Sequence, residues 1–195
     1  MISPYRIAVF GGSFNPPTMG HAMVVQWLLW SGKVDRVMLV PSGGHPFGKP
    51  MIPLEDRAYL LYEMSQDIKQ TSPHATQLRV SQVEGELPKP VYTYDLLTHL
   101  RGELPPPQFE LFFVIGADIL QETANWHKWD KVREEFPLII MGREGYPSPD
   151  GSPTIPNYSS TEVRRRFEAG ENWQELVTPR VRYTYEDVLR VSTAS

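Results

Sequence analysis

Two short stretches of the sequence combine residue types that bind phosphate. The first, residues 10–21, reads FGGSFNPPTMGH. Its glycines let the backbone approach a ligand closely, and its adjacent prolines stiffen the loop. Thr18 is a good N-cap, so we expect a helix from about Met19 whose free N–H groups favour an anion. Thr18 and His21 share one face of that first turn. The stretch predicts a hydroxyl, an imidazole and amides around one phosphate.

The second stretch, residues 158–164, reads YSSTEVR. Ser159 or Ser160 is expected to cap a helix whose N-terminus binds another phosphate. Arg164 follows on the same helix and offers a forked, permanently charged donor for the outer phosphates of a nucleotide. Taken alone, this stretch would be better interpreted as a capped surface helix with a solvated arginine.

The elements that must position these stretches are those of a parallel α/β sheet. Residues 5–10 are predicted to form a buried strand, residues 19–30 a helix and residues 37–40 a second strand, which together make a βαβ unit. Further helices are expected over 53–68, 94–101, 119–123, 129–135, 160–168 and 179–189, strands over 78–83, 110–115 and 138–141, and a long loop over 142–156.

The alternation of strands and helices predicts a single doubly wound, Rossmann-like α/β domain over residues 1–195. A small C-terminal helical part is expected from about residue 157. In such sheets ligands lie at the carboxyl ends of the strands, beside helix N-termini. The first phosphate-binding stretch follows the first predicted strand, which is where a ligand is expected.

Composition restricts the class of partner. The 195 residues are 41% hydrophobic and 22% charged, an ordinary globular balance, and the formal net charge is −4. That charge disfavours a broad nucleic-acid-binding surface, which usually needs a basic face. The absence of cysteine excludes disulfides, thiolate metal sites and cysteine nucleophiles. Neither a signal peptide nor a membrane-spanning stretch is visible, so we expect a cytoplasmic protein without membrane or nucleic-acid partners.

The sequence lacks a residue or spacing that each of several other ligand-binding motifs requires. Residues 43–49 have the P-loop spacing, but Pro50 stands where Ser or Thr must hold Mg²⁺. The GxGxxG fingerprint is absent after the first strand, which removes the main support for a nicotinamide-dependent oxidoreductase. The five histidines show no metal-binding spacing such as HExxH.

The two stretches together resemble the paired motifs of the nucleotidyltransferase superfamily that transfers AMP or CMP onto a phosphate. The second superfamily motif, ISSTx(I/V)R, is matched over residues 159–164. The intervening sequence resembles bacterial nicotinate-nucleotide adenylyltransferases along nearly the whole chain, most clearly at residues 113–120 (FVIGADIL). That subfamily usually has His at the position of Thr18. The first superfamily motif, GxFxPx(H/T)xGH, is matched by Gly12, Phe14, Pro16, Thr18, Gly20 and His21.

The resemblance implies a set of site residues, with Asp118 on a ribose hydroxyl and Trp126 stacked on a pyridine ring. The implied catalytic residues are His21, Thr18, Lys49 and Arg164. The implied ATP-binding residues are Gly11, Gly12, Ser13, Phe14, Gly20, Gly116, Asp118, Ser159, Ser160 and Thr161. The implied pyridine-nucleotide-binding residues are Lys49, Tyr92, Thr93, Trp126 and Arg143. Mg²⁺ would enter with ATP, and no metal site of protein ligands alone is needed.

The implied reaction joins AMP from ATP to nicotinate mononucleotide, giving deamido-NAD and pyrophosphate. Catalysis would come from positioning and charge neutralisation, without a covalent enzyme intermediate. The alternatives are the same chemistry on nicotinamide mononucleotide or phosphopantetheine, a cytidylyltransferase and, more remotely, a non-catalytic nucleotide sensor. Whether the chain forms a homo-oligomer is left open.

Overall fold

The structure, a computed structural model, describes residues 3–44, 50–72 and 77–192. At its centre is a sheet with the strand order β3-β2-β1-β4-β5-β6, in which every pair of neighbouring strands is parallel. This confirms the predicted Rossmann-like α/β class. The strands are β1 (Tyr5–Gly12), β2 (Arg36–Pro41), β3 (Leu78–Val80), β4 (Phe109–Gly116), β5 (Leu138–Arg143) and β6 (Thr154–Ile155).

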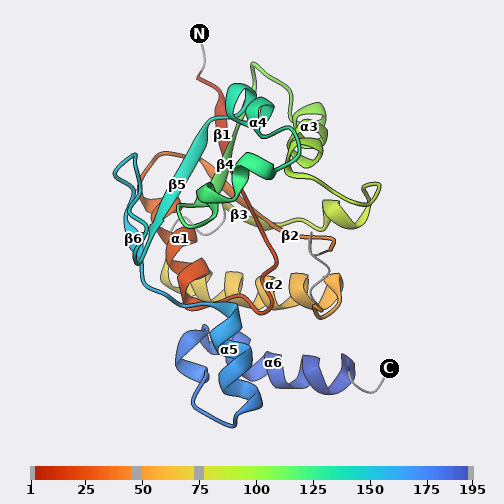
Figure 1. Ribbon diagram of the computed structural model, residues 1–195, viewed down its shortest axis with the longest axis vertical. Helices are drawn as coiled ribbons and strands as arrows, with labels where there is room; N and C mark the ends of the chain where they lie inside the picture. The colour runs from red at the N-terminus through yellow and green to blue at the C-terminus, as the bar shows by residue number, and fades with distance from the viewer. Residues whose placement is uncertain (1–2, 45–49, 73–76, 193–195) are drawn as a thin grey trace.

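Helices cover both faces of the sheet (Figure 1). Alternation along β1 sends Ala8 into a core shared with α1 and α2, while Ile7 and Val9 enter a second core with α3 and α4. Over the described residues, no helix combines the length and apolar character that crossing a bilayer requires. The helices are α1 (Met19–Trp30), α2 (Leu54–Thr71), α3 (Thr93–Glu103), α4 (Trp129–Glu135), α5 (Ser160–Glu168) and α6 (Pro179–Ser192).

The C-terminal helices α5 and α6 lie beyond α1 and α2, in blue in Figure 1. Their buried residues, among them Val163 and Tyr185, belong to the same apolar cluster as the α1 and α2 face of the sheet. Arg180 at the start of α6 pairs with Glu63 of α2 at 3.3 Å. The helix that carries the second phosphate-binding stretch is therefore anchored to the main core.

Most predicted elements differ from the structure by up to three residues at an end, and three predicted segments differ in type as well. The strand expected over 78–83 ends at Val80, because Val83 turns into the opposite core in a 3₁₀ turn, Val83–Gly85. The helix expected over 119–123 is two 3₁₀ turns, Ile119–Gln121 and Thr123–Asn125. The loop expected over 142–156 contains β6. That strand pairs closely with β5, since a Cβ on Gly142 would lie 2.9 Å from Thr154 Oγ1.

The strand order places the site. Successive strands are added on one side of β1 up to β3 and on the other side from β4 onward, so the strand order reverses between β1 and β4. Ligands of open α/β sheets bind at the carboxyl ends of the strands at such a point. Gly12 ends β1 and Gly116 ends β4. The crevice between them is where the two phosphate-binding stretches must meet if they act together.

Candidate nucleotide-binding site

The loop between β1 and α1 is built on a buried aromatic ring. Phe14 adopts φ +45°, a left-handed conformation that bulky residues rarely take, and is 1% exposed. A Cβ on Gly12 would lie 3.3 Å from the Phe14 ring, so glycine allows this close packing. The Phe14 ring centroid lies 4.9 Å from that of His21. Gly12 therefore allows the loop to pack against the Phe14 ring, and that ring contacts the imidazole of His21.

The imidazole of His21 is held in one tautomer. The backbone N–H of Thr18 donates to His21 Nδ1 at 2.9 Å. Because Nδ1 accepts this bond, we assign the proton of the neutral ring to Nε2. Burial lowers the pKa of His21 to about 4, and the positive charge of Arg143 adds to the effect. At neutral pH His21 is therefore an uncharged donor with Nε2–H directed away from the helix cap.

Thr18 faces the protein. Its side chain is fully buried, and its hydroxyl donates to the backbone carbonyl of Tyr158 at 2.9 Å. The same oxygen lies 2.9 Å from His21 Nδ1. The sequence predicted that this hydroxyl and the imidazole would both face a phosphate. In the structure the hydroxyl lies behind the ring and joins it to the segment that leads into α5.

The two motif stretches, residues 10–21 and 158–164, meet through hydrogen bonds between residues 140 or more positions apart. Ser160 Oγ donates to the carbonyl of Pro16 at 2.7 Å. Arg164 Nη1 donates to the carbonyl of Asn15 at 2.6 Å. Of the two candidate caps, Ser159 is the one that caps α5, because its Oγ accepts from Glu162 N at 3.1 Å. The start of α5 therefore holds the β1–α1 loop, which leads into the helical turn that carries His21.

Gly20 makes this approach of the two stretches easier. A Cβ on Gly20 would lie 3.4 Å from Tyr158 Cβ and from the Tyr158 carbonyl oxygen. Those are ordinary contact distances at a crowded point, so a side chain longer than alanine would push the two stretches apart. Gly11 is one of the last two residues of β1, and Ser13 follows the end of that strand. Thr161 Oγ1 accepts from Arg164 Nη2 at 3.3 Å.

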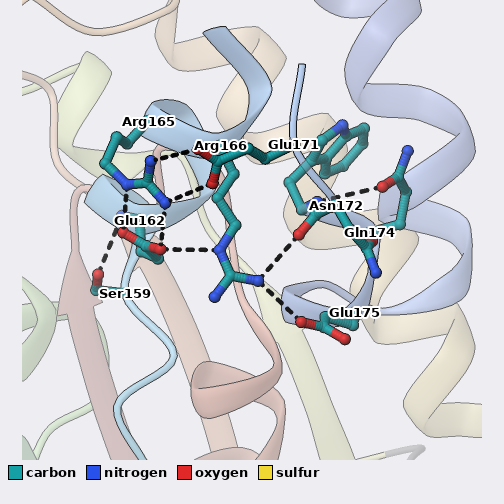
Figure 2. A network of polar contacts seen from close by, with 9 residues as sticks. Ser159, Glu162, Arg165, Arg166, Glu171, Asn172, Gln174 and Glu175 are labelled. Carbon is teal, nitrogen blue, oxygen red and sulfur yellow. Dashed lines mark hydrogen bonds and ion pairs between the residues drawn. The ribbon is translucent and has the colours of Figure 1, made fainter. Parts of the chain in front are cut away.

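The outward face of α5 carries a separate network of charges (Figure 2). Glu162 accepts from Arg165 at 2.9 Å and from Arg166 at 2.8 Å, and these arginines lower the pKa of Glu162 to about 2. Arg165 also pairs with Glu171, and Arg166 with Glu175. Such exposed pairs contribute little individually. They tie α5 to residues 171–175 and keep two of the three consecutive arginines away from the site.

An open pocket of about 370 Å³ lies where β4 and β5 end. Arg143 Nη1 pairs with Asp118 Oδ2 at 2.5 Å, and Asp118 Oδ1 is buried with no hydrogen-bond partner among the described residues. The carboxylate folds back over Gly116, where any Cβ would collide with Oδ1. The lining residues are Asp118, Ile119, Glu122, Arg143, Glu144, Tyr146 and Asn157.

Asp118 and Arg143 thus share one wall, although the sequence assigned them to different nucleotides. The charge of Arg143 also acts on His21, so this pocket and the imidazole belong to one region. Asn157, which the sequence did not single out, lines the pocket, and its Oδ1 lies 3.5 Å from Arg143 Nη2. Its position just before the second motif was the signal that could have found it.

Among the described residues that were predicted to bind the pyridine nucleotide, only Trp126 lines a second opening, while Arg143 lines the first. Trp126 lines a pocket of about 680 Å³, different from the one that Asp118 lines. Trp129 is 8% exposed and belongs to the core, so Trp126 is the more available of the two indoles. Tyr92, 41% exposed, precedes Thr93 at the start of α3, and its ring lies 4.5 Å from that of His127. Lys49 lies outside the described residues.

The strand order, the paired motifs and the neutral donor at His21 define a nucleotidyltransferase. The chain belongs to the cytidylyltransferase-like family, whose model matches residues 9–166. A relative from Anaeromyxobacter dehalogenans (strain 2CP-C), described as a probable nicotinate-nucleotide adenylyltransferase, is 40% identical over 179 residues, covering 90% of this chain and 91% of the relative. The nicotinate-nucleotide adenylyltransferase of Bacillus subtilis (strain 168) is 29% identical over 190 residues, covering 93% and 96%.

Solved structures agree with the relatives. A putative nicotinate-nucleotide adenylyltransferase from Vibrio parahaemolyticus superposes with a TM-score of 0.71 at 25% identity, over 93% of this chain and 92% of that one. The nicotinic acid mononucleotide adenylyltransferase of Plasmodium falciparum, complexed with NaAD, shares the fold with a TM-score of 0.79 at 18% identity, over 97% and 99%. The predicted resemblance and the predicted nucleotidyltransferase class are confirmed.

Proposed function

We propose that the chain joins the AMP part of ATP to nicotinate mononucleotide, forming deamido-NAD and pyrophosphate in NAD biosynthesis. The observation that carries the proposal is the fixed, neutral His21 beside the β1–α1 loop, braced by the second motif at the point where the strand order reverses. The acceptor rests on the relatives, which are described as nicotinate-nucleotide adenylyltransferases.

The reaction forms one bond and breaks one at the α-phosphorus. An oxygen of the acceptor's phosphate attacks, and the bond to the oxygen that bridges to the β-phosphate breaks, so pyrophosphate leaves with the electron pair. His21 donates a hydrogen bond from Nε2 to the α-phosphate, where negative charge builds up. The reaction needs no proton from His21, because the attacking phosphate oxygen already carries negative charge and pyrophosphate leaves as an anion. Thr18 is a positioning residue that fixes the tautomer and the orientation of this ring.

Cationic residues are proposed to bind the outer phosphates of ATP. Arg164 has guanidinium N–H groups beyond the one that it gives to Asn15, and Lys49 is proposed to neutralise phosphate charge. The described residues contain no group of three His, Asp or Glu side chains that could hold a metal ion. Mg²⁺ bound to the phosphates of ATP, its common way of binding, would supply further neutralisation of their charge beside Arg164 and Lys49.

The nucleosides would occupy the two openings. The unpartnered Asp118 Oδ1 can accept from a ribose hydroxyl, as carboxylates at strand ends do in related α/β sites. The accessible face of Trp126, with Tyr92 and Thr93 nearby in the proposal, would receive the pyridine ring. A cytoplasmic enzyme fits this substrate set.

The test is a pyrophosphate-release assay with ATP or CTP against nicotinate mononucleotide, nicotinamide mononucleotide and phosphopantetheine. The expected result is release with ATP and nicotinate mononucleotide, above every other pair. Release with CTP, or with phosphopantetheine alone, would keep the chemistry and replace the substrates. No release with any pair would favour a nucleotide sensor.

A further inference from the structure

A buried arginine outside the predicted site connects the segments that form it. Arg57, in the first turn of α2, is 2% exposed. It donates from Nε to the carbonyl of Ile52 at 2.9 Å, from Nη1 to that of Ser13 at 2.9 Å and from Nη2 to that of Ser42 at 2.7 Å. Arginine keeps its charge in proteins, so this is a buried cation that binds backbone carbonyls. Those carbonyls come from the β1–α1 loop, the end of β2 and the entry to α2.

A partly buried carboxylate, that of Glu84, holds the next backbone group. Glu84 Oε2 accepts from the N–H of Gly43 at 2.8 Å. Burial raises the pKa of Glu84, while the Gly43 bond and the charge of Arg57 oppose the rise. The carbonyl of Ser42 and the N–H of Gly43 belong to the same peptide group. Opposite charges therefore hold both edges of one peptide plane, as β2 ends.

The held peptide is tied directly to the β1–α1 loop. Ser42 N donates to the carbonyl of Gly12 at 2.9 Å, which closes a ring of bonds through Arg57 and Ser13. Ser13 precedes Phe14, whose ring contacts His21. A Cβ on Gly43 would lie 2.8 Å from the carbonyl oxygen of Glu84, so the Glu84 backbone also presses on this peptide. A shift of Arg57 would move the support of the imidazole and the end of β2 together.

We propose that Arg57 and Glu84 are a pair of positioning residues for the adenylyl transfer, which hold the Ser42–Gly43 peptide and the Ser13 carbonyl in register. The inference rests on the proposed function for its kinetic consequence. Neither residue contacts the reacting atoms. Their effect is geometric, and a displacement of about 1 Å at a site of this kind can cost about 10²-fold in rate.

The experiment compares four single variants and one double variant with the intact chain. Arg57→Lys keeps a charge but cannot span three carbonyls, because an ammonium group is a point donor and a guanidinium is a fork. Glu84→Met removes the acceptor at similar volume, whereas Glu84→Gln keeps an acceptor oxygen. Leu61→Ala, a fully buried change on the same helix with no hydrogen bond to the loops, is the control for lost stability. Steady-state rates are measured well below each variant's Tm, together with amide exchange at Gly43.

We expect Arg57→Lys to lower kcat by about 10- to 100-fold and Glu84→Met by about tenfold, with smaller changes in KM. Glu84→Gln should stay near the wild-type rate. Leu61→Ala should lower Tm with kcat kept. The Arg57→Lys, Glu84→Met double variant should lose less than the product of the single losses, because both act on one peptide. Wild-type kcat in both single variants, or fully multiplicative losses, would overturn the proposal.

Amide exchange separates this inference from the proposed function. If the wild-type chain released no pyrophosphate, the proposed function would fail while the paired hold on residues 42 and 43 could still be measured. The Gly43 amide should be protected in the wild type and exchange faster in Glu84→Met and in Arg57→Lys. Equal exchange in all variants would show that neither side chain holds the peptide.

Discussion

The two sides of the site differ in how completely their hydrogen-bonding groups are paired with other groups of the protein. On the α1 side, Thr18, Ser160 and Arg164 all donate to backbone carbonyls of the other stretch. On the β4–β5 side, one oxygen of Asp118 has no partner among the described residues, and the other is held by an arginine whose side chain is 35% exposed. The first side is paired within the protein, and the second has an acceptor oxygen without a partner among the described residues.

This difference predicts that one side of the site acts in catalysis and the other in substrate binding. Preorganised donors contribute most where charge develops in the transition state, since they need not reorganise during the reaction. A buried polar atom without a partner costs about 1–3 kcal/mol, which a ligand hydroxyl can recover on binding. We therefore expect changes on the α1 side to act on kcat and changes on the β4–β5 side to act on KM.

The largest effect is expected from His21→Ala. Loss of the Nε2–H donor should lower kcat by about 10²- to 10³-fold, with KM for ATP changed much less. Pyrophosphate release under saturating substrate measures the rate, and circular dichroism checks the fold. His99→Ala, a change on the surface of α3, is the matched control and should be neutral. A nearly unchanged rate in a folded His21→Ala variant would remove His21 from the chemistry.

Asp118→Asn should act mainly on binding. The substitution keeps the shape but removes the charge that pairs with Arg143, and it leaves one acceptor oxygen where the carboxylate has two, so Arg143 and the proposed ribose hydroxyl can no longer each have their own acceptor. We expect KM for ATP to rise about 10-fold, in the range of a hydrogen bond to a charged group, with kcat nearly constant. Full substrate-dependence curves separate the two constants. If Asp118→Asn lowered kcat alone, the expectation that the β4–β5 side acts on KM would be wrong.

The protonation of His21 gives a pH test of the α1 side. The folded ring has a pKa of about 4, below its ordinary value of 6.5, so between these values the unfolded chain binds more protons. The free energy of unfolding should therefore fall as pH is lowered from 6.5 toward 4, and the effect should shrink in His21→Gln. The ring's NMR shifts should stay constant from pH 8 to about 5. A midpoint near 6.5 would mean that the ring is solvated.

The smallest effect is expected from Glu162→Gln. This change weakens the outward network of α5 shown in Figure 2 and leaves the contacts of Ser160 and Arg164 with the loop untouched. Because exposed ion pairs contribute little, kcat should stay within about twofold and Tm should fall slightly, less so in high salt. Denaturation and rate measurements at two ionic strengths check this. A large loss of kcat would show that the outward network sets the position of α5.

Much of the fold followed from local sequence signals. The predicted bounds of α1, α4 and α5 agree with the structure, because turn and capping residues mark where those helices begin or end. The sequence predictions failed where contacts with neighbouring elements determine the local structure. Residues 154 and 155 have no strand pattern of their own and become β6 by pairing with β5. Val83 leaves the predicted strand because the opposite core accepts its side chain.

The sequence by itself determined the class of protein and the residues that carry its two motifs, because both motifs are local patterns of glycine, proline, cap and charge. Tertiary structure decided which way those residues face. Thr18 turns to a carbonyl of residue 158, and Arg57 joins three backbone carbonyls from separate segments. Backbone carbonyls are the same at every position. A sequence therefore cannot indicate which of them a buried donor will find, and only the packed chain settles it.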